Sequence, residues 1–298
     1  MKLQRGLSSW LDRKIAQLFI APALLVTIAT MILPLLYSMW LSFFNYSLLD
    51  VNNMQFVGIR NYIDLLANQF FKNSVAITAV YAAIATSIEA VLGMVFALLV
   101  NKMVKGQGVI RILVLIPMFI TPVVVALIWR FLFHPELGFI NYFLGTIGLN
   151  SKLTWLGDPR LALTSTILVD IWRGTPFMFL MFLAGIQSLP DDVYEAADID
   201  GANSWTKFRY VTLPLLSPII LVSLIIRGMD ALREFDTLFI LTGGGPGNKT
   251  EVISLLAYRI TFKNLDFGMG AAVSYAIFVL TVILCIVFVR YLQKLQVE

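Results

Sequence analysis

Several charged side chains stand inside stretches of this sequence that are otherwise apolar. Arg227 and Asp230 lie three residues apart, and Arg233 and Glu234 follow about one helical turn after Asp230. On a helix, Arg227, Asp230 and Glu234 would share one face, with Arg233 on its flank. An ionised group is costly in a bilayer core and seldom faces lipid, so this face is expected to look into the protein.

A second pair, Asp170 and Arg173, has the same i, i+3 spacing and lies beside Trp172. Glu89 stands alone in another apolar stretch. Two interpretations stay open: the charges neutralise one another and hold helices together, or they form a polar wall for a hydroxylated solute, with Trp172 or Phe235 stacking on it. The candidates for a solute path are Asp170, Trp172, Arg173, Arg227, Asp230, Arg233, Glu234 and Phe235.

The sequence offers no catalytic or metal site at workable spacing. No Ser/His, His/Glu or paired-Asp arrangement stands in the apolar stretches, and the single histidine, His134, has no Cys or His near it at ligand spacing. The single cysteine, Cys285, can form no intrachain disulfide. The glycine-rich run 243–247 lacks the Gly-Lys-Ser/Thr ending of a phosphate-binding loop. We therefore expect no metal, no cofactor and no enzymatic activity in this chain.

Composition places the chain in a membrane. Of its 298 residues, 59% are hydrophobic and only 13% are charged, far from the balance of a soluble domain. Lys and Arg exceed Asp and Glu by only 22 to 18, which indicates membrane topology rather than nucleic-acid binding. The N-terminus is basic, like that of a signal peptide, but its apolar run continues past a signal peptide's usual length without a small-residue cleavage site. It is interpreted as a retained first span.

Six stretches are long and apolar enough to cross a bilayer, since about 20 apolar residues are needed. The sequence thus predicts an all-α, polytopic protein with six transmembrane helices, and no internal repeat is visible. The expected parts are an N-terminal tail at 1–14, a membrane domain at 15–292 and a C-terminal tail at 293–298. The six spans are expected roughly at 15–44, 74–100, 108–133, 163–189, 213–241 and 267–292.

The distribution of Lys and Arg gives the orientation. Lys and Arg are denser in the two terminal tails and in segments 101–107 and 190–214 than in the segments on the opposite side of the membrane. Because short cytoplasmic segments carry the excess of Lys and Arg, both termini and segment 190–214 are expected to be cytoplasmic.

Prolines inside the expected spans remove backbone hydrogen bonds and bend or break helices. Pro117 and Pro122 should bend the third span, Pro176 the fourth, and Pro214 and Pro218 should shape the entry to the fifth. These are either structural kinks or broken helices that border a path, because irregular backbone at membrane depth is tolerated only against protein or water.

Segment 190–214 is a polar, acidic interruption between two spans. Pro190 suits a first helical turn, and the acidic residues that follow it favour a helix N-terminus. Gly201 is a natural stop, and Ser204 is expected to cap a second short helix that carries Trp205 and Phe208. The pattern predicts a helix, a glycine turn and a helix. Ala196 and Ala197 should leave one face bare for another protein, and Glu195 stands at its edge.

The spacing of these residues resembles the EAA loop of permease subunits of ATP-binding-cassette importers. Glu195, Ala196, Ala197, Gly201, Val211, Leu213 and Pro214 carry the resemblance, and Val211 stands where the family has isoleucine. Other pieces resemble the carbohydrate-uptake branch, the first-permease type of maltose, glycerol-3-phosphate and multiple-sugar systems. They are Asn61-Tyr62, Gly138 with Asn141, Trp172 with Pro176-Phe177, and the run Thr242-Gly243-Gly244-Gly245-Pro246.

This resemblance implies a transport subunit of the inner membrane that has no catalysis of its own. Its implied partners are a second, homologous permease, a dimer of ATPase subunits that hold ATP and Mg, an extracytoplasmic solute-binding protein and membrane lipid. The implied solute is a sugar, a polyol or a sugar derivative, and two arginines in the fifth span leave an anionic derivative open. The residues expected to couple to the ATPase are Glu195, Ala196, Ala197, Asp198, Gly201, Leu213 and Pro214.

Two other classes of function compete with this interpretation. An ion-coupled carrier would use Asp230, Glu234 and Glu89 as ion sites, but segment 190–214 and the lack of internal repeats argue against it. An intramembrane enzyme would need a catalytic constellation, and the apolar stretches offer none at workable spacing.

Overall fold

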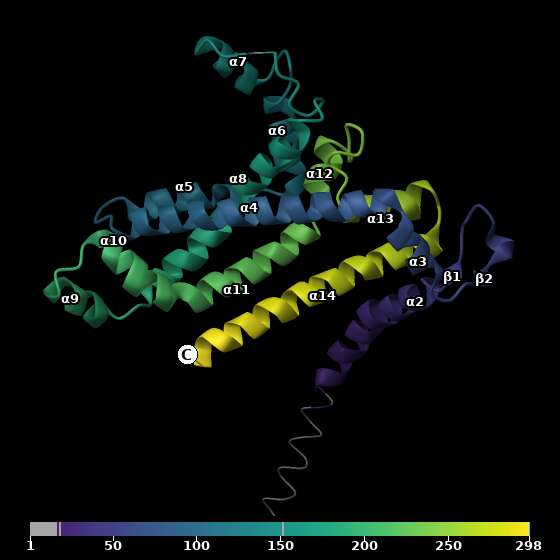
Figure 1. Cartoon of the computed structure of the whole chain (residues 1–298), viewed down its shortest axis with the longest axis horizontal. Helices are drawn as coiled ribbons and strands as arrows, with labels where there is room; N and C mark the ends of the chain where they lie inside the picture. The colour runs from purple at the N-terminus through teal and green to yellow at the C-terminus, as the bar shows by residue number, and fades with distance from the viewer. Residues whose placement is uncertain (1–16, 18, 151, 298) are drawn as a thin grey trace, which may run out of the picture. The chain divides into compact units, whose positions relative to one another are not determined.

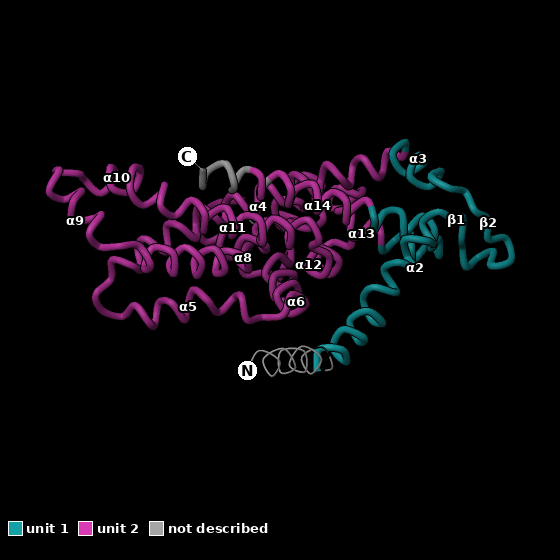
Figure 2. Tube along the Cα trace, turned by 90° about the horizontal axis from the view of Figure 1, so that it is seen from below, with its two compact units in different colours: residues 1–67, 258–275 teal, residues 68–257, 276–298 magenta. Residues whose placement is uncertain are grey.

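The computed structural model describes residue 17 and residues 19–150 and 152–297 (Figure 1). The expected tail at 1–14 and the start of the first span lie outside the described residues. The chain divides into two compact units, Met1–Ala67 with Tyr258–Tyr275 and Asn68–Ala257 with Ala276–Glu298 (Figure 2). We refer to them as unit 1 and unit 2.

The described residues are mostly helical, in agreement with the all-α prediction. The two short strands β1 and β2 pair antiparallel, with Phe44 opposite Phe56. In chain order the elements are η1 (Ile28–Ile32), α2 (Leu33–Leu41), β1 (Phe44–Asn45), η2 (Val51–Asn53), β2 (Gln55–Phe56), α3 (Arg60–Ala67), α4 (Gln69–Asn101), α5 (Gln107–Phe119), α6 (Pro122–Leu132), α7 (Phe139–Thr146), α8 (Ala162–Gln187), α9 (Asp191–Ile199), α10 (Ser204–Lys207), η3 (Phe208–Thr212), α11 (Leu213–Leu232), α12 (Asp236–Leu241), α13 (Ile253–Tyr258), η4 (Arg259–Lys263) and α14 (Phe267–Val297).

Within the described part of the chain, five helices are long and apolar enough to cross a membrane, and a bent pair of helices makes a sixth candidate if the pair is counted as one span. The sixth candidate is α5 with α6, which meet at an angle of 96°. The other five candidates are Phe19–Leu41, Gln69–Asn101, Ala162–Gln187, Ser204–Leu241 and Phe267–Val287.

The expected bend of the third span is confirmed and is a full break. Ile120 and Thr121 are extended, with ψ of 133° and 146°. Pro122 disfavours helical backbone at the residue before it and then suits the first turn of α6. Pro176, in contrast, lies inside an uninterrupted α8.

The fifth span ends at Leu241, as predicted, but it starts earlier than predicted and is interrupted near its end. It begins at Ser204 rather than Leu213, because α10 continues through the π turn η3 into α11 without a loop. Its helix ends at Leu232 and resumes at Asp236 in α12. The predicted common helical face of Arg227, Asp230 and Glu234 is therefore wrong, since Glu234 lies in the break.

Three segments expected to be loops contain ordered elements. The segment that follows the first span holds the β1–β2 hairpin and α3, the segment 134–162 holds α7, and the segment after α12 holds α13. In unit 1, Asn61 donates hydrogen bonds to the carbonyl oxygens of Ser42 and Phe44 at 2.8 and 2.9 Å. In unit 2, Asn141 donates to the carbonyl oxygens of Pro135 and Leu153, both at 2.9 Å. These two asparagines hold their segments in place.

The core of unit 2 forms where α4 and α8 lie side by side, with α5 and α11 against them (Figure 1). Met178, Phe179 and Phe182 of α8 are buried against α4 and α11. The two helices approach closely at Gly93, where an added Cβ would lie 2.5 Å from the Cβ of Met178. The last helix, α14, continues to Val297, so no helix end marks the expected start of the C-terminal tail at 293.

Candidate functional site

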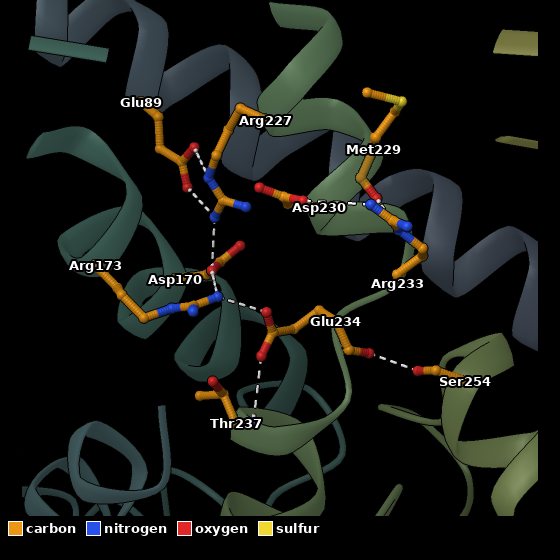
Figure 3. Close-up of polar contacts among 10 residues, drawn as sticks. All are labelled: Glu89, Asp170, Arg173, Arg227, Met229, Asp230, Arg233, Glu234, Thr237 and Ser254. Carbon is orange, nitrogen blue, oxygen red and sulfur yellow. Dashed lines mark hydrogen bonds and ion pairs between the residues drawn. The ribbon is translucent and has the colours of Figure 1, made fainter. Parts of the chain in front are cut away.

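Arg227 is the centre of a buried network that joins three helices of unit 2 (Figure 3). Its Nε lies 2.8 Å from Glu89 Oε2 of α4, and its Nη2 donates to Glu89 Oε1 at 2.8 Å. The same Nη2 lies 2.7 Å from Asp170 Oδ1 of α8. Glu89 and Asp170 are fully buried, and buried charges persist only when they are paired. Glu89, alone by sequence, thus gains its partner through the fold.

Arg173 extends this network to the break in the fifth span. Its Nη2 donates to Asp170 Oδ1 at 3.1 Å and to Glu234 Oε2 at 2.5 Å. Glu234 Oε1 accepts a hydrogen bond from the backbone N–H of Thr237 at 3.2 Å, at the start of α12. The Glu234 carbonyl, released by the end of α11, accepts from Ser254 Oγ at 2.5 Å. The break is therefore held by partners from α8 and α13 that only the tertiary structure supplies.

Asp230 and Arg233 form a separate, exposed pair. Asp230 Oδ1 and Arg233 Nη2 are 3.5 Å apart, and the two side chains are 59% and 58% exposed. Arg233 Nε also donates to the carbonyl of Met229 at 3.3 Å. Arg227, one turn earlier, points instead to α4 and α8 (Figure 3). The four charges expected together in the fifth span therefore divide: Arg227 and Glu234 belong to the buried network, and Asp230 and Arg233 form the exposed pair.

Gly174 makes the buried network possible, and the sequence reasoning missed it. A Cβ at this position would lie 2.5 Å from Arg227 Nε and 2.5 Å from Glu89 Cδ. No larger residue fits without displacing the ion pair. The available signal was a glycine directly after a charged residue inside an apolar helix, where glycine is otherwise unfavourable.

A cavity of about 430 Å³ lies where the two broken spans meet. Met118, Ile120 and Pro122 line it from the α5–α6 break, and Glu234, Phe235 and Asp236 line it from the α11–α12 break. Irregular backbone at membrane depth is tolerated where it lines a cavity, so the two breaks have a shared physical reason. The remaining lining residues are Arg173, Gly174, Phe177, Arg227, Asp230 and Arg233.

Of the two aromatic candidates, only Phe235 borders this cavity. Trp172 is absent from the lining residues and packs edge-on against Trp129, with ring centroids 5.8 Å apart. It belongs to an apolar cluster with Val169 and Leu241. Phe235 lines the cavity and stacks on Phe239, with ring centroids 5.2 Å apart. The expectation that Trp172 stacks on a solute does not fit this geometry.

A larger groove of about 960 Å³ lies between α4, α8, α9, α10 and α11. Its wall is formed mainly by apolar residues such as Met94, Phe182 and Ile186. Such a wall suits an apolar group better than a hydroxylated solute, so the smaller polar cavity is the better candidate for a solute path.

Segment 190–214 folds as a helix and a glycine turn, as predicted. Gly201 has a φ of +74°, which suits glycine. The N–H of Ala202 donates to Ala197 O at 2.9 Å and that of Gly201 to Asp198 O at 3.0 Å. This pair of bonds is the Schellman arrangement that ends a helix. The predicted cap of the next helix is wrong by one residue, because Asn203, not Ser204, accepts from the Thr206 N–H at 2.8 Å.

In the part of the chain that the structure describes, α9 has no buried residue and is held mainly by polar contacts. Tyr194 Oη lies 2.9 Å from Thr212 Oγ1, and Lys207 Nζ lies 2.5 Å from Asp198 Oδ1. Tyr194 and Ala197 are half-buried, whereas Glu195 and Ala196 are exposed. The bare face expected from both alanines is therefore offered by Ala196 alone. Leu213 and Pro214 lie in the first turn of α11 rather than in a loop.

Comparison with known proteins identifies the family. Residues 89–297 match the family described as binding-protein-dependent transport system inner membrane component. The chain belongs to this family. Its relatives include a trehalose/maltose transport system permease protein of Thermococcus litoralis, 40% identical over 280 residues and covering 94% of each chain. A trehalose transport system permease protein of Mycobacterium tuberculosis is 33% identical and covers 94% of this chain and 89% of its own.

Solved structures agree with this fold. A crystal structure of a bacterial ATP-binding-cassette transporter involved in the import of the acidic polysaccharide alginate contains a chain with a TM-score of 0.82. That chain is 22% identical, and the match covers 96% of this permease and 99% of that chain. The chain is thus a multi-pass membrane permease subunit of an ATP-binding-cassette importer, not an enzyme, and the comparisons do not support the ion-coupled carrier.

Proposed function

We propose that this permease carries a sugar, polyol or sugar derivative across the cytoplasmic membrane through the cavity between its two broken spans. The single observation that carries this proposal is that both helix breaks, far apart in the sequence, line the same polar cavity. Discontinuous helices commonly border solute sites in transport proteins. The names of relatives, which refer to trehalose and maltose, support a sugar as the solute.

The charged residues at this cavity have two different roles. The buried network of Glu89, Asp170, Arg173, Arg227 and Glu234 fixes α4, α8 and the α11–α12 break relative to one another. The exposed pair Asp230 and Arg233 offers donors and acceptors to solute hydroxyls, and Phe235 offers a ring face. In this proposal the buried charges hold helices together, and the exposed pair with Phe235 forms the polar wall for a solute.

The second part of the proposal concerns energy coupling. The exposed face of α9, which includes Glu195 and Ala196, contacts an ATPase subunit that binds ATP and Mg. Movement of α9 reaches the cavity because α10, η3 and α11 form one continuous helix from Ser204 to the break. A second, homologous permease completes the path, and a solute-binding protein docks on the outer side near 242–247. The orientation requires both termini to be cytoplasmic.

Blocking the cavity tests this proposal. In the importer reconstituted into liposomes with its partner permease, ATPase and binding protein, Met118→Trp should abolish sugar uptake because the larger side chain fills the cavity. The complex should still assemble and hydrolyse ATP, because Met118 is 42% exposed and lies outside the buried network. The matched control is Leu137→Trp, at an exposed position that does not line the cavity. Normal uptake by Met118→Trp would contradict the proposed path.

A further inference from the structure

Each guanidinium that lines the cavity is already paired with a carboxylate. Arg227 contacts Glu89 and Asp170 at 2.8 and 2.7 Å. Arg173 contacts Asp170 and Glu234 at 3.1 and 2.5 Å. Arg233 contacts Asp230 at 3.5 Å. Among the described lining residues, Arg173 and Arg227 are each shared between two buried carboxylates, whereas Arg233 is exposed and has only Asp230 as its ion-pair partner.

The carboxylates around the cavity outnumber the guanidinium groups. Three arginines line it together with Asp230, Glu234 and Asp236, and Glu89 and Asp170 stand directly behind the wall as ion-pair partners. Asp236 is exposed and is the first residue of α12. The described groups at this site therefore comprise five carboxylates against three guanidinium groups, and even one protonated carboxylate leaves the balance negative.

We infer that the solute of this permease is uncharged and that the cavity excludes anionic sugar derivatives by its charge. The inference rests on the proposed solute path. An anion would enter a negatively biased cavity, where it would compete with Asp230 for Arg233 or would have to take Arg173 or Arg227 from a buried carboxylate. The comparisons leave this question open, because one relative is named for trehalose and a structural neighbour imports an acidic polysaccharide.

The electrostatic bias of the cavity is measurable without knowing the solute. In a Cys285→Ser background, which removes the single native cysteine, Met118→Cys places one thiol on the cavity wall. The complete importer in nanodiscs is then treated with trimethylammonioethyl or sulfonatoethyl methanethiosulfonate, which are cationic and anionic thiol reagents. The ratio of their rates, divided by the ratio for a free small thiol, reports the local potential.

We expect the cationic reagent to be favoured by about tenfold or more at Met118→Cys, since focused fields change local ion concentrations by that order. Adding Asp230→Asn and Asp236→Asn should bring the ratio toward that of the free thiol. The matched control is Val104→Cys, 95% exposed and flanked by Lys102 and Lys105, where the anionic reagent should be favoured.

The outcomes separate the two proposals. Equal rates, or a faster reaction of the anionic reagent at Met118→Cys, overturn the inference of an uncharged solute and leave the proposed path standing. Failure of both reagents to react at Met118→Cys, while Val104→Cys reacts, shows a cavity closed to water and overturns the path as well. A cationic preference that survives Asp230→Asn with Asp236→Asn also overturns the inference, since the bias would then have another source.

Discussion

Replacing Arg227 with methionine tests whether the buried network is what holds α4, α8 and α11 together. The two side chains have similar length, so the substitution removes the charge while retaining much of the packing. It leaves Glu89, which is fully buried, without its ion-pair partner and takes one of two guanidinium groups from Asp170. Removing one partner of a buried pair commonly costs about 3–5 kcal/mol because the remaining charge is uncompensated.

The magnitude distinguishes this effect from the loss of an ordinary contact. Hydrogen bonds between transmembrane helices are worth only about 0.6 kcal/mol on average. If Arg227 only donated hydrogen bonds, Arg227→Met would cost about 1–2 kcal/mol for its contacts together. A loss of about 3–5 kcal/mol therefore indicates a stranded charge. The double variant Glu89→Leu with Arg227→Met removes both partners and should recover part of this loss.

The measurement is the free energy of unfolding of the purified importer in mixed detergent micelles, supported by the fraction of assembled complex after heating. Asp230→Asn is the matched control, because Asp230 and Arg233 form a similar ion pair that is more than half exposed on both sides. Exposed pairs contribute about 0–1 kcal/mol, so this variant should be nearly as stable as the wild type. Equal stabilities for Arg227→Met and Asp230→Asn would refute the reasoning, as would a double variant less stable than Arg227→Met alone.

Three further predictions concern Gly174, Gly201 and Tyr194. Gly174→Ala should reduce the amount of folded complex, because the added Cβ would lie 2.5 Å from Arg227 Nε. The amount of complex is measured on blue-native gels. Normal assembly would mean that the helices move apart without a cost in free energy. Gly201→Val should cost about 1–3 kcal/mol of local strain at a φ of +74° and uncouple ATP hydrolysis from uptake. The control is Gly148→Val, at a φ of +77° with equally open surroundings, which should leave coupling intact. A similar loss of coupling in both variants would contradict a specific role for α9 in coupling. Tyr194→Phe should lower uptake per ATP hydrolysed, since it removes the contact with Thr212 that is worth about 0.5–1.5 kcal/mol, whereas Tyr210→Phe, 75% exposed, should not.

The sequence by itself determined the membrane class, the approximate spans and the local form of segment 190–214. These properties depend on composition and on spacing within one helix or turn, which neighbouring residues decide. Gly201 and the break around Pro122 follow from backbone preferences of glycine and proline that hold in any tertiary context. The i, i+3 pair of Asp170 and Arg173 is equally local, and the structure confirms it.

Only the tertiary structure decided which charges are partners. Helical spacing placed Arg227, Asp230 and Glu234 on one face, yet Arg227 pairs with residues of α4 and α8, and Glu234 lies beyond the end of α11. That helix end is stabilised by Ser254 and Arg173, whose distance in sequence from Glu234 hides them from any local pattern. Trp172 likewise has its place fixed by Trp129 rather than by its own neighbours in the chain. Buried charges choose partners by proximity in space, because in a low-dielectric interior the cost of an unpaired charge outweighs local spacing preferences.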